Sequence, residues 1–349
     1  MSLVKRIMDY PNLFKCKNNF ERYSNIKSVL KYGVPCREEV PCISVIMPVY
    51  NSPCYFKEAL KSVLNQDVEK PYEVIVVDNN DDSDEPTEYE AIVREADDSR
   101  VLYYRNTRNI GMFGNWNRGI ELSNAPYFTF CHDDDAFLTF TLSQLMRNAD
   151  KVKGSALLVP AIRMDEKGVM QAFGKFKIHK RCFGFVTNRE FYPYSMLNQI
   201  LKLPSVGGGC LFSKEKAIAL GGFDEDQYPG GDMAFIANYS RHYGLMYMRT
   251  PGYVYRVGEQ NESNSVWKMF MPFCEHAWND MRAFIPIPNL ILNRLIKARV
   301  NVGKYWTPIE WGVNPDNLIP PSKSDVRLVG LFSKICDMNK FKFCWPWEN

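Results

Sequence analysis

Apolar runs of strand length alternate with helical patterns through the first third of the chain. Residues 42–48, 72–77 and 101–104 are largely apolar, which is typical of strands that are buried on both faces. The first run ends at a proline, which cannot donate to a ladder. Between the runs, residues 55–67 and 87–96 repeat apolar side chains with helical spacing. This alternation predicts a parallel sheet with right-handed crossovers.

A fourth apolar run, residues 127–131, leads through His132 into Asp133, Asp134 and Asp135. Three adjacent anions repel one another, so a folded chain needs a counter-charge if it places them at the buried end of a strand. A divalent cation that is shared with substrate phosphates is the obvious candidate. The alternative is a solvated acidic turn that closes a surface strand.

Polar residues also follow the first two strands. Asn51 comes after the first strand and Asp78 comes directly after the second. Ligands of open parallel sheets bind outside the carboxyl ends of the strands, where these residues and the acidic triplet are expected to converge. Taken alone, Asp78 is better explained as the cap of a turn or helix.

Two further segments carry candidate chemistry. Residues 108–120 contain Gly111 and Gly114 before a helical pattern that runs to Leu122, and a glycine-bearing loop at a helix N-terminus suits an anion, although a plain loop is as common. Asp232 opens an apolar helical pattern that runs to about residue 243. A carboxylate there is either a helix cap or a general base held on a rigid element.

The remaining segments give weaker signals. Residues 1–40 predict a weak helix and a linker. Residues 163–195 predict a hairpin or loop, in which His179 is a surface residue. Residues 289–304 form a basic amphipathic helix pattern, and residues 340–347 mix basic and aromatic side chains. Such a C-terminal extension packs on the domain, contacts another copy, or lies on an anionic membrane surface.

Composition narrows the function classes. The net charge of +3 on 349 residues gives no reason to expect nucleic acid as a partner. Ten cysteines without a CxxC pair and only four histidines argue against a zinc site and favour free thiols. Neither an apolar core of signal-peptide length near the N-terminus nor a run of 18 apolar residues occurs. We therefore expect a reduced, cytoplasmic protein without a transmembrane helix.

Six motifs, in this order, resemble the family 2 glycosyltransferases. They are SVIMPVYN at 44–51, VVD at 76–78, RNxG at 108–111, HDDD at 132–135, GGFDE at 221–225 and GD at 231–232. The resemblance covers residues 42–265 and implies an α/β GT-A fold: a Rossmann-like nucleotide-binding half, with a mixed, mainly parallel sheet flanked by helices, joined to an acceptor-binding half. The implied domains are an N-terminal extension (1–40), the GT-A domain (41–265) and a helical, aromatic and basic C-terminal extension (266–349).

The resemblance also implies an activity. The family moves a sugar from a nucleotide-sugar, most often a UDP-sugar, usually with inversion and with Mn or Mg. The expected acceptor is a hydroxyl of a glycan or a lipid-linked glycan in surface polysaccharide biosynthesis. We expect a cytoplasmic enzyme that is either free or peripheral at the inner face of the membrane through its C-terminal extension, and a homo-oligomer is compatible with the sequence.

The family pattern assigns roles by position. Asp232 would be the general base, and Asp135 with Asp133 would hold the metal. The residues expected to bind the nucleotide-sugar are Pro48, Val49, Tyr50, Asn51, Asp78, Arg108, Asn109, Gly111, Met112, Asn115, Asp133 and Asp134. The sequence assigns no role to His132, whose position beside the triplet suggests a supporting partner of the carboxylates.

The sequence departs from the family pattern at three points, and two alternative functions remain. Gly231 stands where the family often has an acidic residue, no histidine follows Tyr255-Arg256, and the QxxRW signature of processive synthases is absent, which favours addition of a single sugar. A nucleotidyltransferase would be expected to carry a glycine-rich basic loop after the first strand, where this chain has residues 50–53 (YNSP). The other alternative is a catalytically inactive sugar-binding protein, against which the retained carboxylates argue.

Overall fold

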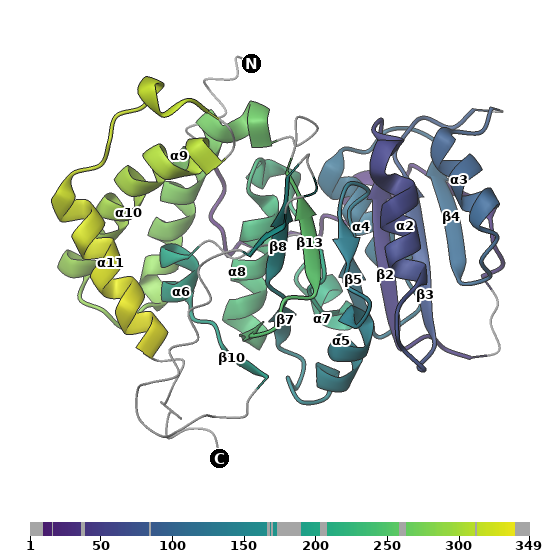
Figure 1. Cartoon of the computed structure of the whole chain (residues 1–349), viewed down its shortest axis with the longest axis horizontal. Helices are drawn as coiled ribbons and strands as arrows, with labels where there is room; N and C mark the ends of the chain where they lie inside the picture. Colours follow the sequence, from purple (N-terminus) through teal and green to yellow (C-terminus); the bar gives the residue numbers. More distant parts are fainter. Residues whose placement is uncertain are drawn as a thin grey trace.

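The computed structural model describes residues 10–15, 17–35, 39–83, 85–165, 168, 170–172, 190–202, 208–257, 263–310 and 313–338. Its main sheet and the crossover helices form one half of the molecule, on the right in Figure 1. The helices of the C-terminal third pack together at the opposite end.

A six-stranded sheet, in the order β1-β4-β3-β2-β5-β11, forms the half of the molecule in which the sequence predicts a parallel sheet. The four inner strands, β4, β3, β2 and β5, are parallel, and β1 and β11 pair antiparallel at the two edges. The bounds are β1 Ser28–Tyr32, β2 Ile43–Val49, β3 Tyr72–Asp78, β4 Val101–Asn106, β5 Tyr127–Phe130 and β11 Phe212–Ser213. This arrangement confirms the predicted fold class, a mixed and mainly parallel α/β sheet.

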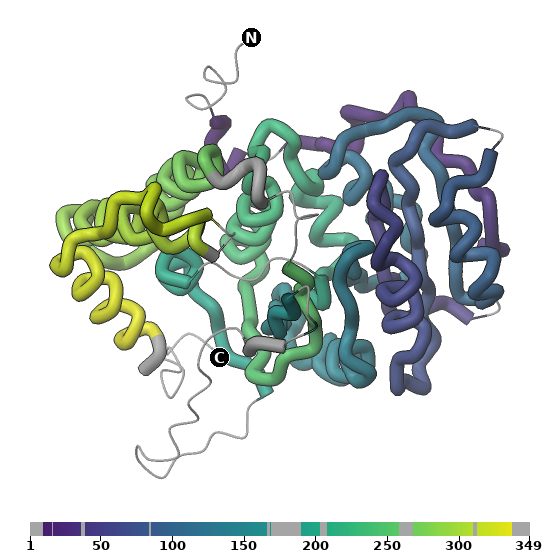
Figure 2. Tube along the Cα trace, turned by 45° about the horizontal axis from the view of Figure 1, so that its top comes forward, coloured from purple at the N-terminus to yellow at the C-terminus, as the bar shows by residue number. Residues whose placement is uncertain are grey.

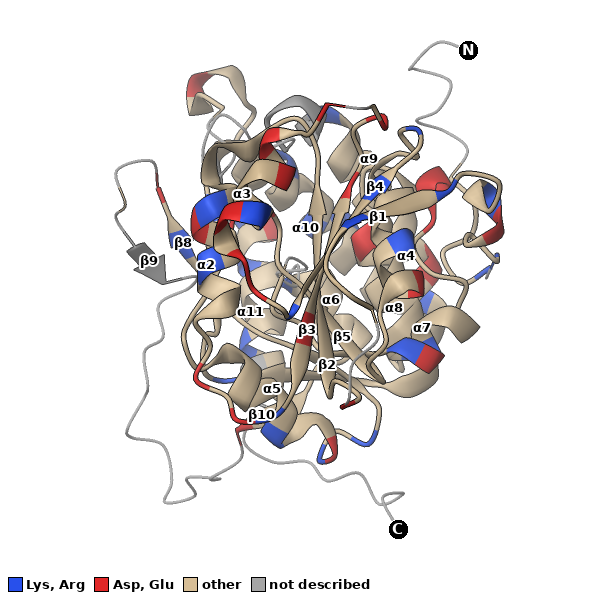
Figure 3. Ribbon diagram, turned by 90° about the vertical axis from the view of Figure 1, so that its right-hand side faces the viewer, with Lys and Arg blue, Asp and Glu red and all other residues tan. Residues whose placement is uncertain are grey.

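Crossover helices cover both faces of this sheet. They are α2 Phe56–Leu64, α3 Glu88–Ala96 and α4 Met112–Leu122. Along β2, Val45 and Met47 join the core beneath α2 and α3, whereas Ile46 joins the core beneath α4. Successive side chains of a strand point to opposite faces, so a strand that is covered on both faces is apolar throughout. Figure 3 views the sheet with α2 and α3 on one side and α4 on the other.

Strand β2 continues for one residue beyond Pro48. The missing amide hydrogen of the proline is tolerated because no described strand pairs with β2 on that side at this position. The carbonyl of Ile46 accepts from the amide of Cys131, and pairing with β5 goes no further. In a parallel ladder alternate residues bond to the same neighbour, so Pro48 also faces β5, at the point where β5 has ended. Val49 still pairs with Asp78 of β3.

Two smaller sheets follow in the second half. One has the order β10-β12-β7, with β10 Phe191–Pro193, β12 Leu245–Met248 and β7 Ala156–Leu158. The other has the order β6-β13-β8-β9, with β6 Ala136–Phe137, β13 Tyr253–Arg256, β8 Ala161–Met164 and β9 Met170–Ala172. Strands β8 and β9 pair antiparallel, as the predicted hairpin requires. His179 lies outside the described residues.

Helices α5 Thr141–Ala149, α6 Met196–Leu201, α7 Lys214–Ala219 and α8 Gly231–Tyr243 accompany these sheets. The C-terminal helices are α9 Ser263–Met281, α10 Asn289–Glu310 and α11 Lys323–Met338. They share a core with α6 and α8 around the buried Trp278. The predicted helix at 289–304 is thus confirmed and extends further, while residues 340–347 lie outside the described part of the chain.

The N-terminal segment corrects one expectation. Instead of a weak helix and a linker, Ser28–Tyr32 forms β1, which pairs antiparallel with β4 at the edge of the main sheet. Upstream, the amide of Leu13 donates to Asp280 of α9. In Figure 2 the purple N-terminal trace accordingly reaches both ends of the molecule. In the part of the chain that is described, no helix combines the length and apolarity that crossing a bilayer requires.

Candidate active site

The acidic triplet follows β5 after two residues, Cys131 and His132. The carboxyl ends of β2 and β3 lie beside it in the sheet. The polar residues that follow β2, β3 and β5 therefore lie at the same edge of the sheet, as the sequence predicts. Each carboxylate of the triplet has different protein partners.

Asp133 is tied to the end of β2. Its Oδ2 accepts a hydrogen bond from the hydroxyl of Tyr89 at 2.7 Å, and this hydroxyl in turn accepts from the amide of Ser52 at 2.9 Å. The backbone amide of Tyr50 also donates to Asp133. Burial raises the pKa of Asp133 to about 7, even though these donors favour its ionised form.

Asp135 is held by β13. Its Oδ1 accepts from the backbone amide of Arg256 at 2.8 Å, and its Oδ2 accepts from the hydroxyl of Tyr253. Both Asp135 and Tyr253 are almost completely buried. Burial, reinforced by the negative charge of Asp134, raises the pKa of Asp135 well above its usual range. The carboxyl group has a fixed orientation and an unfavourable negative charge.

Arg256 is the nearby cation. Its Nε donates to the carbonyl of Asp134 at 3.0 Å, and its Nη2 forms a 2.7 Å ion pair with Glu58 of α2. The guanidinium also lies over the ring of Tyr55, 4.0 Å from the centroid. Burial raises the pKa of Asp134, and the positive charge of Arg256 offsets this only in part. Arg256 therefore divides its positive charge between the triplet and Glu58.

A close backbone approach holds the ring of Tyr253 in place. A Cβ at Gly208 would lie 2.4 Å from that ring and 2.5 Å from the carbonyl oxygen of Phe130. The amide of Gly209 donates to the same carbonyl at 2.8 Å. Only glycine at position 208 therefore lets this segment pass between the end of β5 and Tyr253.

The residues of the triplet fit a divalent cation. Their donors are hard carboxylate oxygens, which Mg and Mn prefer, and burial disfavours their negative charge. Among the described side chains, no three from His, Cys, Asp and Glu converge to hold a metal by themselves. A cation bound through Asp133 or Asp135 would therefore need further ligands, and a diphosphate supplies oxygens of the same kind.

Asp78 is fully buried at the end of β3 and bound by its own neighbours. Oδ2 accepts from the hydroxyls of Thr87 and Tyr103, and Oδ1 accepts from the backbone amide and the side-chain amide of Asn80. Thr87 is also the N-cap of α3, with a hydroxyl that accepts from the amide of Glu90. The carboxylate thus fixes the turn from β3 into α3, the capping role that its sequence context allowed.

The loop before α4 is fixed by an amide network at the same edge. Asn79 accepts from Asn106 and from the amide of Ile110, and donates to Asn109 and to the carbonyl of Gly111. Asn109 in turn accepts from the amide of Gly111, which lies at φ +77° and precedes the helix. This loop therefore has one preferred conformation next to the end of β3.

The backbone amides at the N-terminus of α4 bind a carboxylate of the chain itself. The carboxylate of Glu225 accepts from the amides of Phe113 and Gly114, the latter at 3.1 Å. Burial raises the pKa of Glu225 although both amides favour its ionised form. The sequence suggested that this helix end could bind a phosphate, whereas two of its amides bind Glu225, the last residue of the GGFDE motif.

Asp232 lies in the first turn of α8, as its sequence position predicts. Its Oδ1 accepts from the amide of Met233 at 2.7 Å. Burial raises the pKa of Asp232 to about 6, although this amide favours the ionised form. A carboxylate with this pKa is an effective proton acceptor near neutral pH.

Contacts between aromatic side chains of α4 connect the N-terminus of α8 with the triplet. The ring of Trp116 lies 5.0 Å from that of His132 and 5.3 Å from that of Phe113. Phe113 in turn packs so closely on Gly231 that a Cβ there would lie 2.5 Å from its ring. Burial lowers the pKa of His132 to about 4, so this side chain is a neutral ring in the stack.

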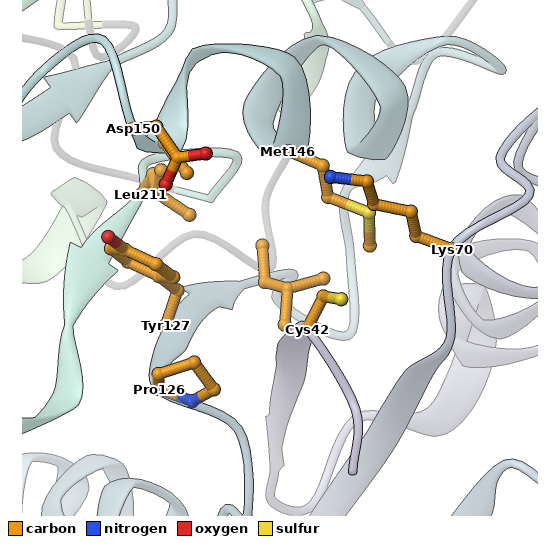
Figure 4. A pocket seen from close by; sticks show the side chains of 9 residues that line it. Cys42, Lys70, Pro126, Tyr127, Met146, Asp150 and Leu211 are labelled. Atoms are coloured by element: carbon orange, nitrogen blue, oxygen red, sulfur yellow. The ribbon is translucent and has the colours of Figure 1, made fainter. Parts of the chain in front are cut away.

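A pocket of about 140 Å³ lies elsewhere, at the amino ends of the strands (Figure 4). Cys42, Lys70 and Pro126 line it just before β2, β3 and β5 begin, and Asp150 lines it from the end of α5. Ligands of parallel sheets bind at the opposite edge. This pocket is therefore separate from the candidate active site.

A family model described as Glycosyl transferase family 2 matches residues 44–216. The matched region runs from β2 past the triplet into α7, and so includes the four parallel strands of the main sheet and the triplet. The chain belongs to glycosyl transferase family 2.

A curated relative carries a specific name. The GalNAc(5)-diNAcBac-PP-undecaprenol beta-1,3-glucosyltransferase of Campylobacter jejuni is 35% identical over 113 residues, which are 32% of this chain and 36% of that protein. The chain spans between about a third and three fifths of the length of the first curated relatives it matches.

Solved structures share the fold. Residues 1–349 of TarS from S. aureus, in complex with UDP-GlcNAc, match with a TM-score of 0.53 at 16% identity, covering 76% of this chain and 73% of that one. The mannosyltransferase PcManGT from Pyrobaculum calidifontis, in complex with GDP-Man and Mn²⁺, matches with a TM-score of 0.50 at 15% identity, covering 91% and 86%.

The remaining predicted residues of this family 2 chain fall into two groups. Tyr50, 49% exposed, and Asn51, at φ +54°, follow β2, and Arg108 is exposed. Pro48 and Val49 are in the sheet, Met112 begins α4, and the amide of Asn115 is buried between Val77 and Asn106. Their predicted contacts with a nucleotide-sugar stay predictions.

Sequence reasoning missed the tyrosines that hold the triplet. Tyr89 lies in the predicted helix after β3, and Tyr253 lies two residues before the Tyr255-Arg256 pair. Nothing in the local pattern distinguishes them from core aromatics. The one available signal was Arg256, which the family pattern includes and whose amide and guanidinium both reach the triplet.

Proposed function

We propose that this chain is a metal-dependent, inverting glycosyltransferase that moves one sugar from a nucleotide-sugar to an acceptor hydroxyl. The observation that carries the proposal is the buried triplet at the end of β5, with Asp133 and Asp135 fixed by Tyr89 and Tyr253. Carboxylates whose negative charge is disfavoured by burial suit a divalent metal and a diphosphate.

The comparisons support the choice of substrates. Two structures of this fold carry nucleotide-sugars, UDP-GlcNAc and GDP-Man, and one of them carries Mn²⁺. The Campylobacter relative is named for an undecaprenol-linked acceptor. We therefore propose a UDP-sugar as donor, a glycan or lipid-linked glycan as acceptor, and a role in surface polysaccharide biosynthesis at the cytoplasmic side of the membrane.

The chemistry follows from the groups of the chain. Asp232 takes the proton from the acceptor hydroxyl while the hydroxyl oxygen forms a bond to the anomeric carbon. The bond from this carbon to the diphosphate oxygen breaks on the opposite face, so the anomeric centre inverts and a nucleoside diphosphate leaves. Mn or Mg, held by Asp135 and Asp133, would supply positive charge for this leaving group. A covalent intermediate is not required.

The direct test measures nucleotide release from a panel of UDP- and GDP-sugars with and without Mn²⁺. We expect at least one donor to be hydrolysed slowly by the wild-type chain with Mn²⁺, and this turnover to fall by roughly 10²–10³-fold in Asp135→Asn. Asp150→Asn is the matched control, because that exposed carboxylate lies at the other edge of the sheet. Full turnover by Asp135→Asn would disprove the metal assignment, and transfer of a nucleotidyl group instead of a sugar would disprove the reaction.

A further inference from the structure

Helix α11 has one face in the C-terminal core and one face toward solvent. Its inner face buries Asp325 and Cys336. Three large apolar side chains of the helix are nevertheless exposed, Val326 at 47%, Leu331 at 56% and Ile335 at 43%. An amphipathic helix that packs only within its own domain normally has polar residues at such positions.

The exposed apolar residues are accompanied by cations. Lys323, Arg327 and Lys334 are exposed on the same helix. At helical spacing Arg327, Leu331, Lys334 and Ile335 share one face, because each of the other three lies three or four residues from Leu331. We call the residues Lys323, Arg327, Leu331, Lys334 and Ile335 the outer face of α11.

Among residues 323–336, whose side chains the structure describes, this face carries no carboxylate; Asp337 follows near the end of α11. The one acidic residue between positions 323 and 336 is Asp325, which is buried and forms a 2.6 Å ion pair with Arg294 of α10. From position 289 to position 349 the sequence holds nine Lys and Arg against five Asp and Glu. This excess of +4 exceeds the +3 of the whole chain, so the rest of the chain carries about one negative charge net.

We propose that the outer face of α11 binds the surface of an anionic lipid bilayer. Apolar side chains between cations are the combination that an interfacial helix uses, with the apolar groups at the acyl boundary and the cations at the headgroups. A second copy of the chain is a poor occupant, because a twofold contact would bring these cations against one another. A protein partner would have to present acidic residues of its own to these cations.

The position of α11 suits this role. It lies at the end of the molecule opposite to β4 and α3 (Figure 1). A bilayer bound there would contact the C-terminal helices and leave the far strands of the sheet free. This inference does not depend on the proposed function, and its test uses neither donor nor acceptor.

The test is flotation of the full chain with vesicles. Vesicles of phosphatidylcholine and phosphatidylglycerol are compared with vesicles of phosphatidylcholine alone, at low and high salt. We expect binding to the anionic vesicles only, weakened by salt. Arg327→Gln with Lys334→Gln should reduce the partition coefficient at least tenfold, since each cation near such a surface contributes roughly fivefold. Leu331→Ser with Ile335→Ser should also abolish most of the binding.

Matched controls separate the outer face from general charge and apolarity. Lys61→Gln with Lys70→Gln removes the same charge from exposed positions near α2 and β3, and Val40→Ser with Ile218→Ser removes exposed apolar side chains elsewhere. Both controls should bind like the wild type. Equal losses in variants and controls, no binding to anionic vesicles, or a lower molecular mass of the α11 variants in lipid-free light scattering would overturn the proposal.

Discussion

The hydroxyl of Tyr253 donates a hydrogen bond to Oδ2 of Asp135, 118 residues earlier in the chain. The bond joins β13, in the second half of the molecule, to the acidic triplet at the end of β5. With the amide of Arg256 on Oδ1, it fixes both oxygens of the carboxylate. Asp135 therefore has one orientation before any ligand binds.

Tyr253→Phe tests this relationship. Loss of the hydroxyl leaves Oδ2 of a buried carboxyl group without this partner, so we expect the free energy of unfolding to fall by about 1–3 kcal/mol. We also expect weaker Mn²⁺ binding in calorimetry, because the carboxylate is no longer held in place. The matched control is Tyr127→Phe, whose hydroxyl lies at the amino-end pocket (Figure 4) and should change neither quantity. Unaltered Mn²⁺ affinity in a folded Tyr253→Phe chain would refute the positioning role.

Gly208→Ala should disturb the same tyrosine from its other side. The added methyl group would meet the ring of Tyr253 and the carbonyl of Phe130, and overpacking of this kind costs about 1–3 kcal/mol. Urea denaturation measures the loss. Gly330→Ala is the control, since its helical site on α11 has nothing within 4 Å of the added atom and should be slightly more stable. A Gly208→Ala chain as stable as the wild type would mean that the contact relaxes freely.

The pKa of Asp232, about 6, sets a pH dependence for transfer. A general base acts in its ionised form, so kcat/KM should rise about tenfold per pH unit below 6 and level off above 7. Asp232→Asn should abolish transfer, together with this limb of the profile, while the chain still binds the donor in a fluorescence titration. Transfer that persists in Asp232→Asn, with the same profile, would assign the proton to another group.

Much of the fold could be predicted from the local pattern of apolar residues. The runs at 42–48, 72–77 and 101–104 form β2, β3 and β4 because both faces of these strands are covered, which makes them apolar throughout. Strand β1 escaped prediction because Ser28–Tyr32 is a short edge strand whose side chains are half-buried, apart from the exposed Val29. Its assignment depends on pairing with β4, more than 70 residues later.

The residues of the candidate site likewise include some that the sequence could predict and some that it could not. Asp133, Asp135 and Asp232 could be chosen from their places at the ends of elements, because strand ends and helix starts are visible in the sequence. Tyr89, Tyr253 and Glu225 could not, since their roles depend on contacts that the fold makes between distant segments.

The most direct test of the central claim locates the metal in crystals grown with UDP and Mn²⁺. The anomalous signal of manganese identifies the ion without assumptions about activity. The account predicts one strong peak in coordination contact with a carboxylate oxygen of Asp135 or Asp133, bridged to the diphosphate. UDP bound with no manganese peak at the triplet, or a peak held by other carboxylates, would contradict it.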